Sequence, residues 1–134
     1  KDKQEIIQSL KVIIDESELP IFGICLGHQL MALAMGADTA KLKYGHRGSN
    51  HPVKDVEKDR VFITSQNHGY TILPESLPEC AAITHINMND QTIEGLRYEG
   101  KKMFSVQFHP EASPGPEDTA YLFDEFLAMM KESR

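Results

Sequence analysis

Cys25 is placed where the chain could present a reactive thiol. It lies in the middle of residues 23–29, GICLGHQ, between an apolar run over residues 20–24 and a helical pattern over residues 27–35. A side chain on the sharp turn between a buried strand and a helix projects out of the sheet toward substrate. The positive end of the following helix favours the thiolate form of a cysteine. The sequence therefore predicts a nucleophile elbow, with glycines on both sides leaving room for a strained backbone.

A histidine and a carboxylate that could complete this chemistry come near the end of the chain. His109 follows residues 103–108, whose alternation predicts a strand, and Pro110 ends that strand. Glu111 then falls in a turn, from which it could orient one ring nitrogen while the other faces a thiol. Triad members are defined by their roles in space and not by sequence order. We therefore predict a catalytic triad of Cys25, His109 and Glu111.

Together, GICLGHQ at residues 23–29 and HPE at residues 109–111 resemble the class I (triad) glutamine amidotransferases. Members of that family hydrolyse the side-chain amide of glutamine and deliver ammonia to a partner active site. Within the family, three further segments resemble the small chains of carbamoyl-phosphate synthetase: residues 50–53 (NHPV), 66–70 (QNHGY) and 112–116 (ASPGP). The resemblance covers essentially the whole chain.

The resemblance implies a role for each matching residue. Cys25 would be the nucleophile, His109 the general acid and base, and Glu111 its orienting partner. Leu26 would offer its backbone N–H to the oxyanion. The rest of the glutamine site would be formed by one residue of the helix after the elbow and by a tight loop that acts largely through its backbone: Gln29, Asn67, Gly69 and Tyr70.

The resemblance also implies a partner. A large synthetase chain, carrying ATP and Mg, would combine the ammonia with bicarbonate to make carbamoyl phosphate for arginine and pyrimidine synthesis, while this chain would hold no cofactor. Three alternatives stay open from the sequence. The ammonia could serve anthranilate, GMP or CTP synthesis; the cysteine could belong to a peptidase acting on γ-glutamyl substrates; or the chain could be a catalytically silent binding module.

The start of the chain departs from the family pattern. Class I members place a Gly-Pro-Gly type loop before the elbow, and its glycines help to complete the oxyanion hole. This sequence opens at Lys1 directly into a helical pattern with Ile6, Leu10 and Ile13 on one face. We expect residues 1–134 to be the C-terminal part of a single glutamine amidotransferase domain, truncated at its N-terminus, and to be a poor glutaminase alone.

The element order predicts an α/β fold. A helix, a buried strand and the elbow helix are followed by five candidate strands, at residues 40–43, 61–64, 81–86, 93–98 and 103–108. A last helix is expected after residue 116, with an apolar stripe packed on the sheet. The predicted architecture is a three-layer sandwich with a central, mostly parallel sheet, similar to class I glutamine amidotransferases and flavodoxin-like.

Composition narrows the function further. The formal net charge of −6 gives no basic surface for nucleic acid. No apolar run approaches the roughly 20 residues of a membrane span, and no secretory signal pattern is visible, so a cytoplasmic location is expected. Cys80 reads as an incidental thiol. The six histidines lack CxxC or HExxH spacing, so no metal site is predicted, and three of them are expected to shape loops: His46, His51 and His68.

Overall fold

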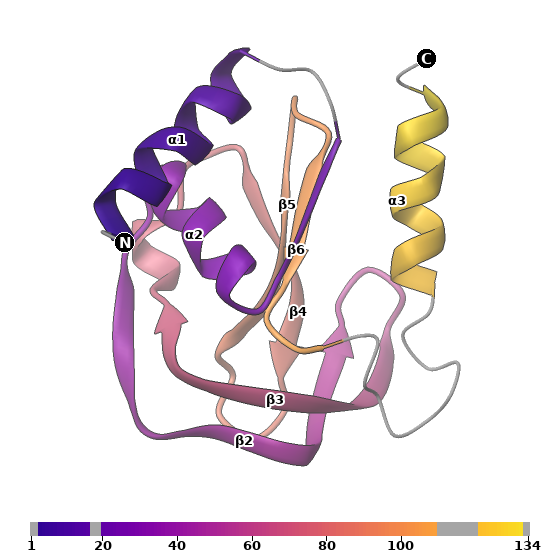
Figure 1. Cartoon of the computed structure of the whole chain (residues 1–134). Coiled ribbons are helices and arrows are strands. Elements are labelled where there is room, and N and C mark those ends of the chain that lie inside the picture. The colour runs from indigo at the N-terminus through magenta and orange to yellow at the C-terminus, as the bar shows by residue number, and fades with distance from the viewer. Residues whose placement is uncertain (1–2, 17–19, 110–120, 133–134) are drawn as a thin grey trace.

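The computed structural model describes residues 3–16, 20–109 and 121–132. The elements in chain order are α1 (Lys3–Glu16), β1 (Ile21–Ile24), α2 (Leu26–Ala34), β2 (Thr39–Asp55), β3 (Arg60–Ile72), the 3₁₀ turn η1 (Pro74–Ser76), β4 (Ala81–Asn87), β5 (Ile93–Tyr98), β6 (Met103–Val106) and α3 (Tyr121–Glu132). Helices α1 and α2 lie on one side of the sheet and α3 on the other (Figure 1). The predicted α/β fold with helices flanking a central sheet is confirmed.

The described strands form one mixed sheet in the order β1-β6-β5-β4-β2-β3. Only β1 and β6 pair in parallel; the other four described pairings are antiparallel. The expectation of a mostly parallel sheet is therefore wrong for this part of the chain. The physical reason is the length of the connections, because a parallel pair needs a crossover of a dozen or more residues and these strands are joined by short turns.

Strands β2 and β3 are much longer than predicted and form a curved pair along one end of the molecule (Figure 1). The register shifts between Lys41 and His46 and again between Gly48 and His51, and the two strands pair regularly beyond each shift. His46 and His68 pair across the two strands, and His51 also lies in β2. The prediction that these three histidines shape loops is wrong. Residues 66–70, implied to be a tight loop, belong to β3.

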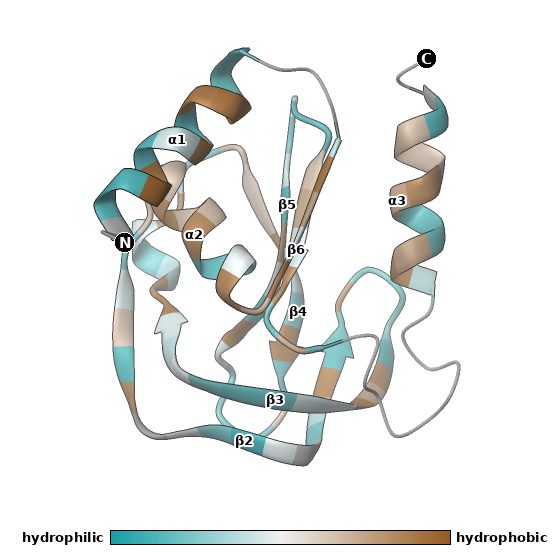
Figure 2. Ribbon diagram, in the orientation of Figure 1, coloured by the Kyte–Doolittle hydropathy of each residue, from teal (hydrophilic) through white to brown (hydrophobic). Residues whose placement is uncertain are grey.

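Apolar side chains pack on both faces of the sheet. On the side of α1 and α2, the buried set includes Met31, Ile72 and Leu96; on the other side, Leu122 of α3 packs with Val106 and its neighbours. Helices α1 and α3 alternate between hydrophobic and hydrophilic segments along their length (Figure 2). The apolar stripe of α3 is buried only in part, since Leu127 and Met130 are exposed. The predicted start of this helix lies outside the described residues.

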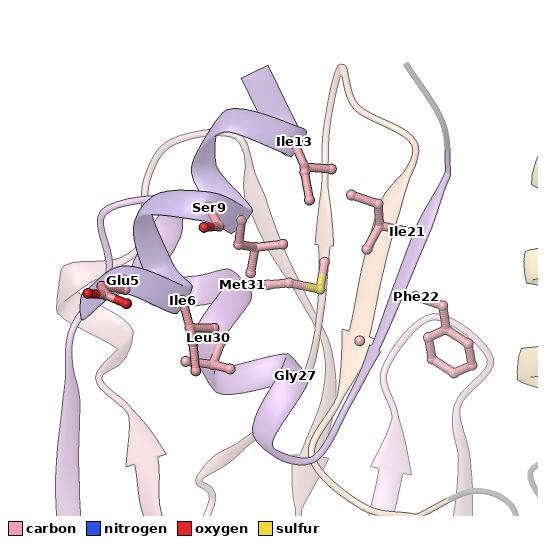
Figure 3. A pocket seen from close by; sticks show the side chains of 11 residues that line it. Glu5, Ile6, Ser9, Ile13, Ile21, Phe22, Gly27, Leu30 and Met31 are labelled. Carbon is pink, nitrogen blue, oxygen red and sulfur yellow. The ribbon is translucent and has the colours of Figure 1, made fainter. Parts of the chain in front are cut away.

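A pocket of about 470 Å³ separates α1 from β1 and α2 (Figure 3). Ile6 and Ile13 of α1 line it and stay exposed, whereas Ile14 is buried in the core and Ile7 and Leu10 pack against the core while partly buried. The lining is apolar apart from Glu5 and Ser9, so the pocket offers few groups for chemistry. No helix in the described ranges is long and apolar enough to cross a membrane.

Candidate functional site

Cys25 has the backbone conformation of a nucleophile elbow. It sits between β1 and α2 with φ 55° and ψ −109°, a region that non-glycine residues rarely occupy. Its backbone N–H donates to the carbonyl of Val106 at 2.9 Å, which ties the turn to β6. The surrounding structure thus holds a strained residue in place, as the sequence predicts for an exposed nucleophile.

The two flanking glycines have different roles. A Cβ at Gly23 would lie 2.4 Å from the Met31 sulfur and 3.1 Å from the backbone of Gly27, so this position accepts no side chain without rearrangement. A Cβ at Gly27 would meet nothing within 4 Å. The expectation that both glycines relieve crowding is therefore wrong for Gly27. Close packing of α2 on β1 therefore requires a glycine at position 23 and not at position 27.

The parallel pairing of β1 with β6 carries Cys25 and His109 to the same edge of the sheet. Ile24 is in register with Val106, so Cys25 and Gln107 are the first residues beyond the paired ends. His109 follows two residues after Gln107, and its backbone N–H donates to the backbone carbonyl of Ser65 in β3 at 3.0 Å. Carboxyl ends of adjacent parallel strands are where open α/β sheets bind ligands. Glu111 lies outside the described residues.

Residues implied to bind glutamine lie around this edge. The Gln29 side-chain amide donates to the backbone carbonyl of Tyr70 at 3.0 Å, and the Cys25 sulfur is 4.0 Å from the carbonyl oxygen of Asn67. Leu26 begins α2, where backbone N–H groups have no partner within the helix. Gly69 lies between Asn67 and Tyr70 in β3. The predicted residues within the described ranges therefore come from four neighbouring segments: the turn after β1, α2, β3 and the segment that follows β6.

Gln107 is a site residue that sequence reasoning missed. Its side chain is fully buried. The side-chain oxygen Oε1 accepts a hydrogen bond from Gln29 Nε2 at 2.9 Å, and the side-chain nitrogen Nε2 lies 3.8 Å from the Cys25 sulfur. It thus connects the nucleophile to the helix that follows it. The signal in the sequence was an amide within the apolar run of residues 103–108, two positions before His109.

His28 is buried beside this region and is held neutral. Burial lowers its pKa from 6.5 to about 3, with further lowering from His68 and His85. Its Nδ1 is 2.7 Å from the Ser105 hydroxyl, which joins α2 to β6. A histidine with this pKa is uncharged at neutral pH, so we assign it a structural position and not the acid and base role.

A second group of buried polar residues adjoins the site through Tyr70. His68 Nδ1 donates to the Tyr70 carbonyl at 2.8 Å, the same oxygen that Gln29 contacts. On its other side His68 faces His46, and the pKa of His46 is raised to about 9, first by its hydrogen bond with Glu94 and also by Asp90, against the effect of burial. Among the described residues, His46, His68 and Glu94 have a geometry that could hold a metal ion.

The chain matches one protein family and a consistent set of relatives. The sequence model of the family "Glutamine amidotransferase class-I" matches residues 2–129. Two relatives described as the carbamoyl phosphate synthase small chain are similar: that of Bacillus caldolyticus is 59% identical over 133 residues and that of Symbiobacterium thermophilum 52% over 132. A pyrimidine-specific small chain of Bacillus subtilis is 55% identical over 131 residues. Each alignment covers 98% of this chain but only 35–36% of the relative, so the chain spans about a third of their length.

Solved structures share the fold. A structure described as a GMP synthase protein from Thermoplasma acidophilum superposes with a TM-score of 0.82 at 26% identity, covering 98% of this chain and 67% of that one. A glutamine amidotransferase from Thermotoga maritima gives 0.68 at 25% identity, covering 97% and 54%.

Proposed function

The chain belongs to the class I glutamine amidotransferases, and on this premise we propose that it forms the glutaminase part of glutamine-hydrolysing carbamoyl-phosphate synthetase. The observation that carries the proposal is the strained elbow at Cys25, on the same sheet edge as His109. Identity of 52–59% with relatives described as carbamoyl phosphate synthase small chains supports this member of the family over the anthranilate, GMP and CTP alternatives.

Hydrolysis of an amide requires a strong nucleophile and an acid. In the proposed reaction His109 takes the thiol proton, and the Cys25 sulfur attacks the side-chain carbonyl carbon of glutamine. The negative oxygen is stabilised by the Leu26 backbone N–H at the start of α2. His109 then gives the proton to the nitrogen, so ammonia leaves and a γ-glutamyl thioester remains on Cys25. Water, activated by His109 with Glu111 orienting the ring, hydrolyses the thioester to glutamate.

Substrate binding is assigned to Gln29 and to the β3 segment of Asn67, Gly69 and Tyr70. Both hydrogens of the Gln29 amide nitrogen are engaged, one with the Tyr70 carbonyl and one with Gln107. This arrangement leaves the Gln29 carbonyl oxygen to accept from the ammonium group of bound glutamine. The amide is oriented before substrate arrives, which reduces the entropy lost on binding.

The proposed partner is a large synthetase chain. It would use ATP, with Mg, and bicarbonate to convert the ammonia to carbamoyl phosphate in the cytoplasm, for arginine and pyrimidine synthesis. The relative described as pyrimidine-specific supports the second of these pathways. The proposed chemistry needs no cofactor in this chain, because a thiol and an imidazole supply both the nucleophile and the acid.

The test measures glutamate release from glutamine by three preparations: this 134-residue chain, the longer small chain, and the longer chain with its large partner. We expect little turnover from the first, because the second oxyanion donor is attributed to a family loop that it does not encode. Turnover should rise with the longer chain and couple to carbamoyl phosphate formation with the partner. Glutamate release without carbamoyl phosphate in the third preparation would contradict the proposed partner. Full activity of the 134-residue chain would contradict the account of the oxyanion hole.

A further inference from the structure

Three buried side chains from three different strands converge behind Tyr70. They are His46 of β2, His68 of β3 and Glu94 of β5, and one nitrogen or oxygen atom of each lies within 4.8 Å of the others. Their exposed fractions are 6%, 8% and 0%. Charged or ionisable groups this deeply buried are normally paired or bound to a metal ion.

Hydrogen-bond donors are too few for the atoms that meet here. His68 Nδ1 faces the Tyr70 carbonyl at 2.8 Å, so the single proton of a neutral ring is used there. Its Nε2 is then a lone pair, yet it lies 2.8 Å from Gln66 Oε1 and 3.2 Å from His46 Nδ1. An acceptor therefore faces an acceptor at Gln66.

Turning the amide of Gln66 would not relieve this conflict. Its nitrogen donates to the hydroxyl of Thr64 at 3.0 Å, and that hydroxyl already donates to the His51 carbonyl at 2.8 Å. The reversed amide would place its oxygen against a hydroxyl with no proton left to give. The oxygen of Gln66 thus belongs on the side of His68.

Glu94 adds two more acceptors. One of its oxygens accepts from Asn87 at 3.1 Å and lies 3.4 Å from His46 Nδ1, while the other has no hydrogen-bond partner among the described residues. His46 Nε2 faces Asp90 at 2.7 Å, and its Nδ1 faces both His68 Nε2 and Glu94, so even a ring protonated on both nitrogens has one proton for two acceptors. One proton on Nδ1 would satisfy one of these contacts, whereas a divalent cation would satisfy all of them.

The separations fit a metal ion. Bonds of about 2.0–2.1 Å to a tetrahedral zinc place neighbouring ligand atoms about 3.3 Å apart. The observed separations from His46 Nδ1 are 3.2 Å to His68 and 3.4 Å to Glu94. Each ring also holds its remote nitrogen against a carboxylate or a backbone carbonyl, Asp90 and Tyr70 respectively, which is the usual arrangement around metal-bound histidines.

We propose that His46, His68 and Glu94 bind a divalent transition-metal ion of the zinc class. The ion would fix the β3 segment whose Tyr70 carbonyl also holds Gln29, so its occupancy would act on glutamine binding and not on the thiol itself. Sequence spacing predicted no metal site because the ligands come from three strands that meet only through long-range pairing, with no local motif.

The test titrates Co²⁺ into the complete protein carrying Cys25→Ser, which prevents binding at the catalytic thiol. We expect one Co²⁺ per chain, with the visible absorption of a tetrahedral site, displaced by Zn²⁺. Glu94→Gln and His46→Gln should each weaken binding at least about 100-fold, because each removes a direct ligand. His51→Gln, a histidine of the same strand outside the ligand set, and Glu99→Gln should bind as the parent does.

Absence of stoichiometric Co²⁺, or equal affinity in Glu94→Gln and Glu99→Gln, would overturn the proposal. A variant that fails to fold is recognised by circular dichroism, and Asp90→Asn then decides. Its side chain is 41% exposed and contacts only the far nitrogen of His46 among the proposed ligands, so folding should be kept. Loss of this outer partner should weaken Co²⁺ binding roughly 10-fold, and an unchanged affinity would contradict the site.

Discussion

The elbow around Cys25 and the paired region of β2 and β3 are built in opposite ways. At the elbow the backbone and close packing set the geometry: a positive φ at Cys25, a glycine against Met31, and a parallel register with β6. Around His68, the geometry depends on buried polar side chains: Gln66 of the same strand, and Glu94 and His46 from distant segments. The nucleophile is thus positioned by backbone and packing. The paired region of β2 and β3, which forms one wall of the proposed glutamine site, is positioned by a hydrogen-bonded network.

This difference predicts different responses to mutation. Changes of volume should damage the elbow most, because its residues are close-packed. Changes of charge or of hydrogen-bonding capacity should damage the β2 and β3 wall most, because an unpaired buried polar group costs more than a lost contact. Gln107 contacts Cys25 directly and reaches β3 through Gln29, which also donates to the Tyr70 carbonyl, so this position should respond to a loss of polarity.

The largest expected effect is at the nucleophile. Cys25→Ser in the complete enzyme should lower glutaminase kcat by about 10⁴-fold or more, because a hydroxyl replaces the only attacking thiolate. Glutamine binding, measured by calorimetry, should change little. Cys80→Ser is the matched control and should keep full activity. A Cys25→Ser enzyme within about tenfold of the parent would remove this residue from the mechanism.

Gln107→Leu should lower kcat/KM by about 10- to 100-fold, equivalent to about 1–3 kcal/mol for a buried group left without its partner. The change leaves one hydrogen of the Gln29 amide without an acceptor beside the thiol. Steady-state kinetics of the complete enzyme provide the measurement, and Gln8→Leu, on the exposed surface of α1, is the control. Equal kinetics in the two variants would show that Gln107 does not connect the two regions.

Two substitutions at the elbow separate packing from conformation. Gly23→Ala should lower the free energy of unfolding by about 1–3 kcal/mol, because its Cβ meets Met31 and the Gly27 backbone. Gly27→Ala meets nothing and lies in α2, so it should be neutral or raise stability by up to about 1 kcal/mol. Urea unfolding of both variants gives the comparison, and a larger loss at Gly27 would contradict the packing of α2 on β1.

The sequence predicts the elbow better than the pair of β2 and β3, for the same physical reason. The elbow is local, so residues 23–29 alone predicted the turn at Cys25 and the helix after it. The wall depends on pairing between β2 and β3, which no short segment encodes. Strands predicted at residues 40–43 and 61–64 therefore ended too early, and His46 and His68 were assigned to loops instead of a strand pair.

The sheet shows the same limit. Sequence predicted the α/β fold and placed four of the six described strands well, because alternation over residues 81–86 and 93–98 is a local signal. Strand direction depends on connection length and on which strands become neighbours. Glu94 carried no signal at all, since a carboxylate in a strand is usually exposed and its burial depends on partners such as Asn87 from β4.

A further expected effect concerns pH. Folding lowers the pKa of His28 from 6.5 to about 3, so the unfolded chain binds this proton more readily than the folded chain does. The corresponding stability is present above pH 6.5 and is lost as pH falls from 6.5 toward 3, by about 1 kcal/mol per pH unit. Urea unfolding between about pH 7 and pH 5 measures the slope. His28→Gln should flatten it, and an unchanged slope would assign the pH dependence to other groups.

Alkylation by iodoacetamide tests the central claim, that the elbow makes Cys25 an activated nucleophile. Cys25 and Cys80 are both partly buried thiols in the same chain, so exposure does not distinguish them and Cys80 serves as an internal control. Mass spectrometry of both peptides across a pH series gives the two rates. Cys25 should react faster and keep its reactivity at lower pH, because the start of α2 and His109 favour its thiolate. Equal rates with an ordinary thiol profile at both residues would contradict the account.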